Sequence, residues 1–227
     1  MSADMLGCNA SGFSRGERGT IVVFQKKAGF GALLKMIHLN FSTEVLDEFR
    51  DHFNRSISQQ EKSIKESFKA VSVSDFESRD DYESYLSSLH DDFWQSDEVR
   101  NLGEELSIVG LHRLVEIKIG KVLRGTFPNL TDKKRQDLIA GKSGVIDCPN
   151  LVGYAAANEL RLINNCVKHN DSIVDEKLAT AFPSWTKGEP LKNLGTHYSH
   201  LKEGVTEYIK AFVTEAHAKT TAFSSTP

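Results

Sequence analysis

The chain has 227 residues, of which 39% are hydrophobic and 26% are charged, the balance of a globular protein with a buried core. Its formal net charge of −3 excludes a general attraction to nucleic acid, so RNA or DNA binding would need a local basic patch. Cys8, Cys148 and Cys166 show no CxxC spacing, which argues against a disulfide framework and fits a reducing compartment. With no long apolar run and no secretory leader, we expect a cytoplasmic protein without a membrane segment.

Residues 1–40 differ in pattern from the rest of the chain. Residues 1–19 are rich in glycine, serine and charge, which predicts a flexible N-terminus. The run TIVVFQ at residues 20–25 is the only strand candidate, because β-branched residues favour strands. The next run, FGALLKMIHLNF, fits a short helix or a second strand, and its periodicity does not decide between them.

From residue 42 the periodicity is helical. Ser74 with Asp75, and Ser96 with Asp97, are expected to cap the starts of two separate helices. The predicted helices cover residues 42–71, 75–93, 96–123, 131–141, 152–169 and 196–218. This pattern predicts a mainly all-α fold, an up-and-down bundle of about five or six helices over residues 41–220, with a small N-terminal β element. Residues 221–227 are expected to form a disordered tail.

The helix expected at residues 152–169 has an unusual polar face. On a helical wheel one side collects Tyr154, Asn158, Arg161, Asn165, Lys168 and His169. Asn164 lies beside this ladder. Asparagine is a poor helix former, so its repeated use favours side chains selected for hydrogen bonding over a plain solvent-exposed face. The most fitting target for such a face is a phosphate group.

The helix expected at residues 96–123 is apolar almost all the way round, as in a central helix buried on most sides. Glu105, His112 and Glu116 share one side of it. A buried carboxylate needs a partner, so we expect Glu116 to meet Arg161 or Lys168, in a structural or a catalytic role. Glu159, on the apolar side of its own helix, is expected to meet Arg113. No histidine or cysteine spacing indicates a metal site, and no cofactor is expected.

The segments GEELSIVGLHRLVEIKIGKVL and NELRLINNCVKH resemble the paired central helices of HEPN domains, the "higher eukaryotes and prokaryotes nucleotide-binding" superfamily. The likeness covers residues 96–170. Active members of that family carry an arginine, usually followed by a polar residue, four to six residues before a histidine. Here Asn164 holds the usual arginine position before His169, and the nearest upstream arginine, Arg161, leaves seven residues between.

The resemblance implies a helical bundle that forms homodimers and acts as a metal-independent endoribonuclease, as in toxin–antitoxin and phage-defence systems. RNA would be the substrate, and an antitoxin or defence component a partner protein. The implied catalytic residues are His169, Arg161, Asn165 and Asn164, with Lys168, Asn158 and Tyr154 binding substrate and Glu116 and His112 in support. The alternative is a catalytically inactive HEPN-like module that binds a partner protein or a nucleotide, because its motif is degenerate.

Overall fold

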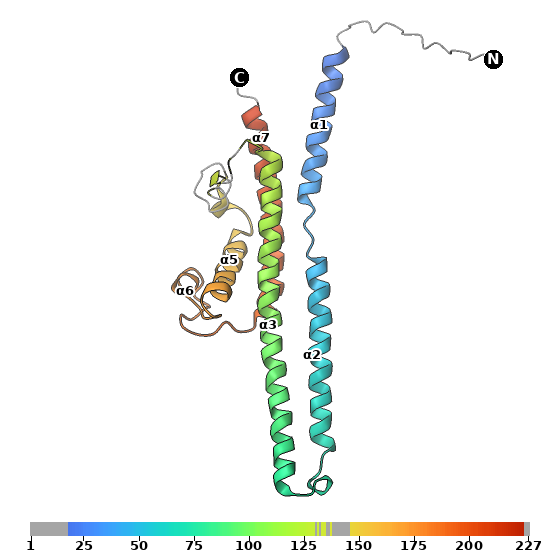
Figure 1. Cartoon of the computed structure of the whole chain (residues 1–227). Coiled ribbons are helices and arrows are strands. Elements are labelled where there is room, and N and C mark those ends of the chain that lie inside the picture. Colours follow the sequence, from blue (N-terminus) through green and yellow to red (C-terminus); the bar gives the residue numbers. More distant parts are fainter. Residues whose placement is uncertain (1–17, 130, 132, 135–136, 138–145, 225–227) are drawn as a thin grey trace, which may run out of the picture.

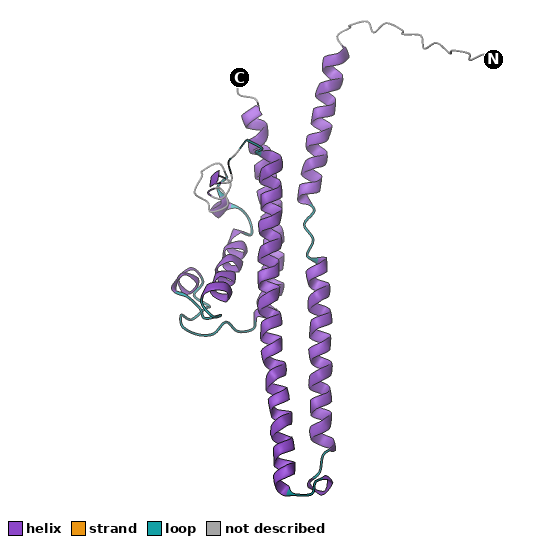
Figure 2. Ribbon diagram, in the orientation of Figure 1, coloured by secondary structure: helices purple, strands orange, loops and turns teal. Residues whose placement is uncertain are grey.

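The computed structural model describes residues 18–129, 131, 133–134, 137 and 146–224. Within these ranges the chain is helical and contains no β-strand, only an isolated bridge between Ile173 and Pro190 (Figure 2). The helices are α1 (Arg18–Leu39), α2 (Glu44–Ala70), α3 (Arg79–Thr126), α5 (Tyr154–His169), α6 (Glu176–Ala181) and α7 (Leu194–Ser224), with 3-10 turns at Val73–Asp75 and Cys148–Asn150. The predicted all-α helical fold is confirmed. The short helix expected at residues 131–141 lies largely outside the described residues.

The long helix α3 is the axis of the molecule (Figure 1). α2 runs antiparallel to it, and α1 continues the line of α2 toward the opposite end. α7 lies along the upper part of α3, α5 packs against both of these helices, and α6 packs on α5. The lower parts of α2 and α3 therefore extend beyond the bundle as a two-helix hairpin.

The core forms where α3, α5 and α7 meet, because each of these helices presents an apolar stripe to the other two. Its largest fully buried side chains from these three helices are Ile108, Leu111, Leu123, Leu160, Ile163, Tyr198, Leu201, Ile209 and Phe212. This core holds α5, and with it the polar face of α5, in a fixed position against α3.

The strand expected at residues 20–25 is wrong, because these residues belong to α1. A lone β-type run has no ladder partner in the described chain, whereas a helix satisfies its backbone groups within the segment. The C-terminal end of α1 is docked by His38, which is 6% exposed and whose Nδ1 lies 3.0 Å from Nε2 of His217 on α7. Lys118 of α3 also donates to the carbonyl of Ile37 at 3.1 Å. Residues 29–39 are therefore part of the folded assembly.

The two helices expected at residues 75–93 and 96–123 are one continuous helix, α3. Ser96 is buried and does not cap a helix, since its Oγ donates to the carbonyl of Asp92 at 3.0 Å. The actual cap is Ser78, whose Oγ accepts from the backbone N–H of Asp81 at 3.1 Å. Ser74 and Asp75 do not cap an α-helix either. Oδ2 of Asp75 accepts a hydrogen bond from the backbone N–H of Ser72, which caps the 3-10 turn. Packing against α2 thus outweighs a local cap signal.

The disordered tail expected at residues 221–227 is also partly wrong. α7 continues to Ser224, and of the residues expected in the tail only 225–227 lie outside the described chain. The same helix begins at Leu194, two residues before the expected start.

Candidate functional site on α3 and α5

The start of α5 is fixed by a close approach to α7. Gly153 caps the helix with φ at 79°, in the left-handed region. A Cβ atom there would lie 2.2 Å from the carbonyl oxygen of Gly204 and 2.6 Å from the backbone N of Tyr208. Glycine is therefore required both by its conformation and by the space, and it sets the position of every polar residue that follows on α5.

The outer face of α5 carries three exposed side chains of the predicted ladder: Arg161, Lys168 and His169. Nη2 of Arg161 donates to Oδ1 of Asn158 at 2.8 Å, so Asn158 holds the guanidinium on this face. Asn165 is half-buried. Tyr154 is half-buried too and packs edge-on against Tyr208, with ring centroids 6.1 Å apart, which ties it to α7.

Asn164 does not lie on this outer face. It is 2% exposed, and its Oδ1 is a buried atom without a hydrogen-bond partner. Because α5 is wedged between α3 and α7, its buried arc is wider than the helical wheel indicates and includes residue 164. The side chain at the usual arginine position of the HEPN pattern is therefore turned inward.

His112 of α3 lies against this part of α5. Its side chain is 13% exposed, and its Nδ1 makes no hydrogen bond but lies 3.8 Å from Oε2 of Glu116. Burial lowers the pKa of His112, the positive charges of Lys168 and Arg161 lower it further, and Glu116 opposes the shift. The structure thus brings His112, Arg161 and Lys168 together from two helices, with the imidazole held neutral.

The partners predicted for the carboxylates of Glu116 and Glu159 are wrong. The side chain of Glu116 is 47% exposed, and its nearest cation is Arg113, with Nη1 at 3.5 Å, rather than Arg161 or Lys168. This side of α3 is open, since Leu102 and Leu106 are exposed as well. Glu159 accepts from the indole Nε1 of Trp185 at 2.8 Å, not from Arg113.

Glu105 of α3 is paired with Ser172, whose hydroxyl donates to Oε1. Asp171 and Ser172 have φ of 48° and 58°, so the chain turns sharply after α5 and brings Ser172 back to α3. Sequence reasoning missed this contact. The adjacent Asn170, Asp171 and Ser172 are typical turn residues and were the available signal.

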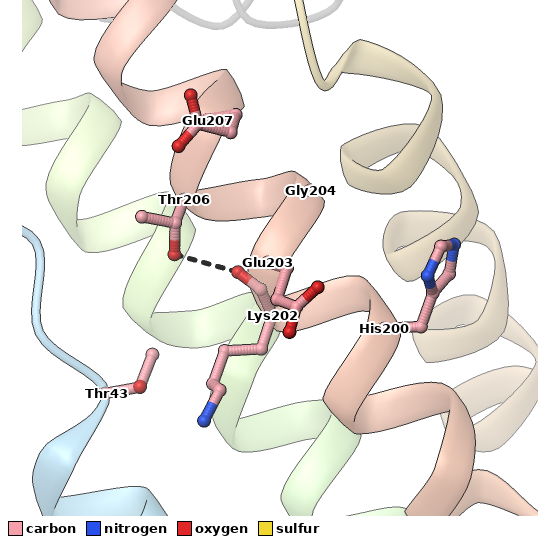
Figure 3. Close-up of a pocket in the computed structure, with 7 residues that line it drawn as sticks. All are labelled: Thr43, His200, Lys202, Glu203, Gly204, Thr206 and Glu207. Atoms are coloured by element: carbon pink, nitrogen blue, oxygen red, sulfur yellow. Dashed lines mark hydrogen bonds between the residues drawn. The ribbon is translucent and has the colours of Figure 1, made fainter.

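A hollow in the described part of the molecule lies elsewhere. Figure 3 shows it along α7, with Thr43 and Lys202 at one side and His200 at the other. It has a volume of about 550 Å³. Lys202 is paired with Asp47 at 3.3 Å, and Thr206 donates to the carbonyl of Lys202 at 2.8 Å. The Lys202–Asp47 pair holds α7 to α2.

The described ranges contain neither a metal-binding cluster nor a membrane-spanning helix. No three His, Cys, Asp or Glu side chains gather there at a spacing that could hold a metal ion. None of the described helices has the length and apolar character needed to cross a lipid bilayer.

Comparison with known proteins gives no match: no family model, no curated protein and no solved structure is similar to this chain. The resemblance to HEPN domains therefore rests on the two quoted segments.

Proposed function

We propose that the chain is a HEPN-like metal-independent endoribonuclease with its centre on the α3 and α5 face. The observation that carries the proposal is the grouping of a neutral histidine, His112, with two cations, Arg161 and Lys168, that form no ion pair within the described chain. A cationic pair beside a proton acceptor is what cleavage of a phosphodiester requires. Because the net charge is −3, attraction of RNA would depend on a local basic group such as this one.

The proposed reaction uses the ribose 2′-hydroxyl as the nucleophile. His112, kept neutral by burial and by the neighbouring cations, accepts the 2′-hydroxyl proton. The 2′-oxygen attacks phosphorus while Arg161 and Lys168 bind the phosphate oxygens, and the bond to the 5′-oxygen breaks. His169, exposed at the last turn of α5, donates a proton to that leaving oxygen. The products are a 2′,3′-cyclic phosphate and a 5′-hydroxyl.

In this proposal Asn158 and Asn165 orient the groups around the phosphate, and Glu116 with Arg113 borders the site on α3. The same resemblance supports a cytoplasmic homodimer that belongs to a bacterial toxin–antitoxin or phage-defence system and is restrained by a partner protein. Asn164 has no direct role, since its side chain is buried.

The test is cleavage of total RNA in the presence of EDTA by the wild-type chain and by His112→Ala, His169→Ala and Arg161→Ala. Each substitution is expected to lower the rate by about a hundredfold or more. His200→Ala, an exposed histidine on α7, is the matched control and is expected to cut at the wild-type rate. Chemical analysis of the 3′ ends is expected to find cyclic phosphate. Equal cutting by all variants contradicts the assignment of the site.

The second candidate is a non-catalytic module that binds a partner protein or a nucleotide through the same face. The observation in its favour is that the position at which the family carries its arginine holds Asn164, whose side chain is buried. This candidate predicts that no RNA is cut at any salt concentration. RNA binding by an active site would weaken steeply with salt, whereas a protein contact would change little.

A further inference from the structure

A second hollow lies where the α2–α3 hairpin meets the start of α7, and it is independent of the proposed ribonuclease face. Its volume is about 460 Å³, within the usual range for small-molecule sites. Three helices line it. The lining residues are Arg50, Asn54, Ile57 and Ser58 of α2, Arg100 and Glu104 of α3, and Gly195, Thr196 and Ser199 of α7. Most of these side chains are polar, in contrast to the stripes that form the core.

Arg50 is held rigidly at this hollow. Its Nη2 donates to the carbonyl of Gly195 at 3.0 Å, and its guanidinium carbon lies 3.8 Å from the ring centroid of Tyr198. The same guanidinium also interacts with the side chain of Tyr198, so two contacts from α7 orient Arg50. An arginine oriented in this way presents a preorganised donor fork.

Arg100 faces the same hollow from α3. It is anchored by its pair with Glu61 through Nη2. Its Nε, however, is a buried atom with no hydrogen-bond partner. A buried N–H of a charged group without an acceptor is unfavourable, and a bound molecule in the hollow would supply the acceptor.

Four neutral polar residues complete the lining. Asn54 and Ser58 follow Arg50 at one and two helical turns on α2, and Thr196 and Ser199 lie in the first turns of α7. These four residues are exposed, and their side chains form no hydrogen bond within the described chain. Glu104 supplies the one carboxylate among the described lining residues. The hollow therefore combines solvent-accessible polar groups with a single strong acceptor.

We propose that this hollow binds a small phosphate monoester. Arg50 and Arg100 donate to the phosphate oxygens, since arginine forks match phosphate geometry. Thr196 and Ser199 add hydroxyl donors from α7, and Glu104 accepts from a hydroxyl or amino group of the ligand. Binding there joins the hairpin to α7, because the ligand contacts α2, α3 and α7 together.

The test is isothermal titration of the full chain, in a buffer without phosphate, with inorganic phosphate, adenosine monophosphate and adenosine. Saturable binding of the monophosphate with a dissociation constant below about 1 mM is expected, and none of adenosine. Inorganic phosphate is expected to bind more weakly than the monophosphate, since it lacks the sugar hydroxyl and base amino groups that could donate to Glu104. Equal binding of adenosine and its monophosphate, or no saturable binding of either phosphate, overturns the proposal.

Matched variants locate the site. Arg100→Gln is expected to weaken binding at least about tenfold, and Ser199→Ala, which leaves both arginines in place, about threefold. Arg79→Gln is the control, because Arg79 is another arginine of α3 paired with a glutamate, Glu83, at 2.9 Å but far down the hairpin. It is expected to bind as the wild type does. Equal weakening by Arg79→Gln and Arg100→Gln, or wild-type binding by Ser199→Ala and Arg100→Gln, contradicts the assignment.

Discussion

The two halves of α3 are the same helix but are buried very differently. Its upper half packs against both α5 and α7, and its side chains Ile108, Leu111, Val122 and Leu123 are fully buried. Its lower half pairs with α2 alone and buries little more than Leu89 and Ser96 (Figure 1). A pair of helices can bury only one stripe of each, whereas a third and fourth helix close the core. Burial, rather than helix length, thus divides the molecule into a stable bundle and a weaker hairpin.

The largest contrast is expected from isoleucine truncation in the two halves. Ile163→Ala, in the bundle, removes a fully buried side chain from three packed helices and is expected to cost about 4 kcal/mol of unfolding free energy. Ile64→Ala, in the hairpin, is expected to cost about 2 kcal/mol, since α2 and α3 can close over the gap. Denaturant titration measures both.

Val45→Ala, at a side chain that is 82% exposed, is the control and should leave stability within about 0.5 kcal/mol of wild type. Hydrogen exchange adds a second readout. Ile64→Ala is expected to speed amide exchange in the hairpin only. Equal costs for Ile64→Ala and Ile163→Ala would remove the distinction between the two halves.

Substitution of two glycines tests the same difference between bundle and hairpin, with smaller expected losses of stability. Gly153→Ala is expected to destabilise by roughly 3 kcal/mol, since its positive φ and the backbone of α7 both exclude a methyl group. At Gly103, where the hairpin joins the bundle, the atoms nearest to an added Cβ belong to the ring of Phe53. Gly103→Ala is therefore expected to cost roughly 1 kcal/mol, because a side chain can move where a backbone cannot. Thermal melts compare them, and the reverse order would show that the junction is the more rigid region.

The smallest expected effect is a loss of stability at low pH. The pKa of His38 is lowered by burial, by His217 and by Lys118, and that of His217 by burial and by Lys35. A histidine whose folded pKa lies below its unfolded value of 6.5 takes up its proton first in the unfolded chain. Stability is therefore expected to fall as the pH drops through about 6.5 toward the folded pKa.

Melting temperatures between pH 7.5 and 5.5 measure this loss, which His38→Gln should reduce and His200→Gln, on the exposed side of α7, should leave unchanged. Because His38 and His217 join α1 to α7, the loss belongs to the bundle rather than the hairpin. A melting temperature that rises on acidification would contradict the sign of these shifts.

Much of the fold follows from sequence periodicity, and the errors have local causes. The helical pattern from residue 42 onward placed α2, α5 and most of α7 correctly. Ser96 carries a typical cap signal, yet nothing local shows that α2 packs over it. Residues 20–25 have strand propensity, and their helical state depends on the absence of a partner strand in the described chain.

The sequence predicted which residues share one face of α5, but not which residues of α3 lie against that face. The spacing of Asn158 and Arg161 anticipates their hydrogen bond, because residues three apart on a helix are neighbours. That Asn164 is buried and Glu116 is exposed depends on where α3 and α7 lie around α5, which a wheel drawn for a single helix omits. The role of His112 likewise required the register between α3 and α5.

Because α3 is one unbroken helix, a small change in its tilt moves its far end by a larger distance. From Gly103 down to Arg79 the helix extends about 36 Å at 1.5 Å per residue, beyond the level at which α7 begins. A tilt of about 10° at Gly103 would therefore displace the hairpin tip by roughly 6 Å. Phe53, stacked on Phe49, lies directly against Gly103, the point about which such a tilt would turn. The hairpin and the residues around His112 are parts of the same unbroken helix.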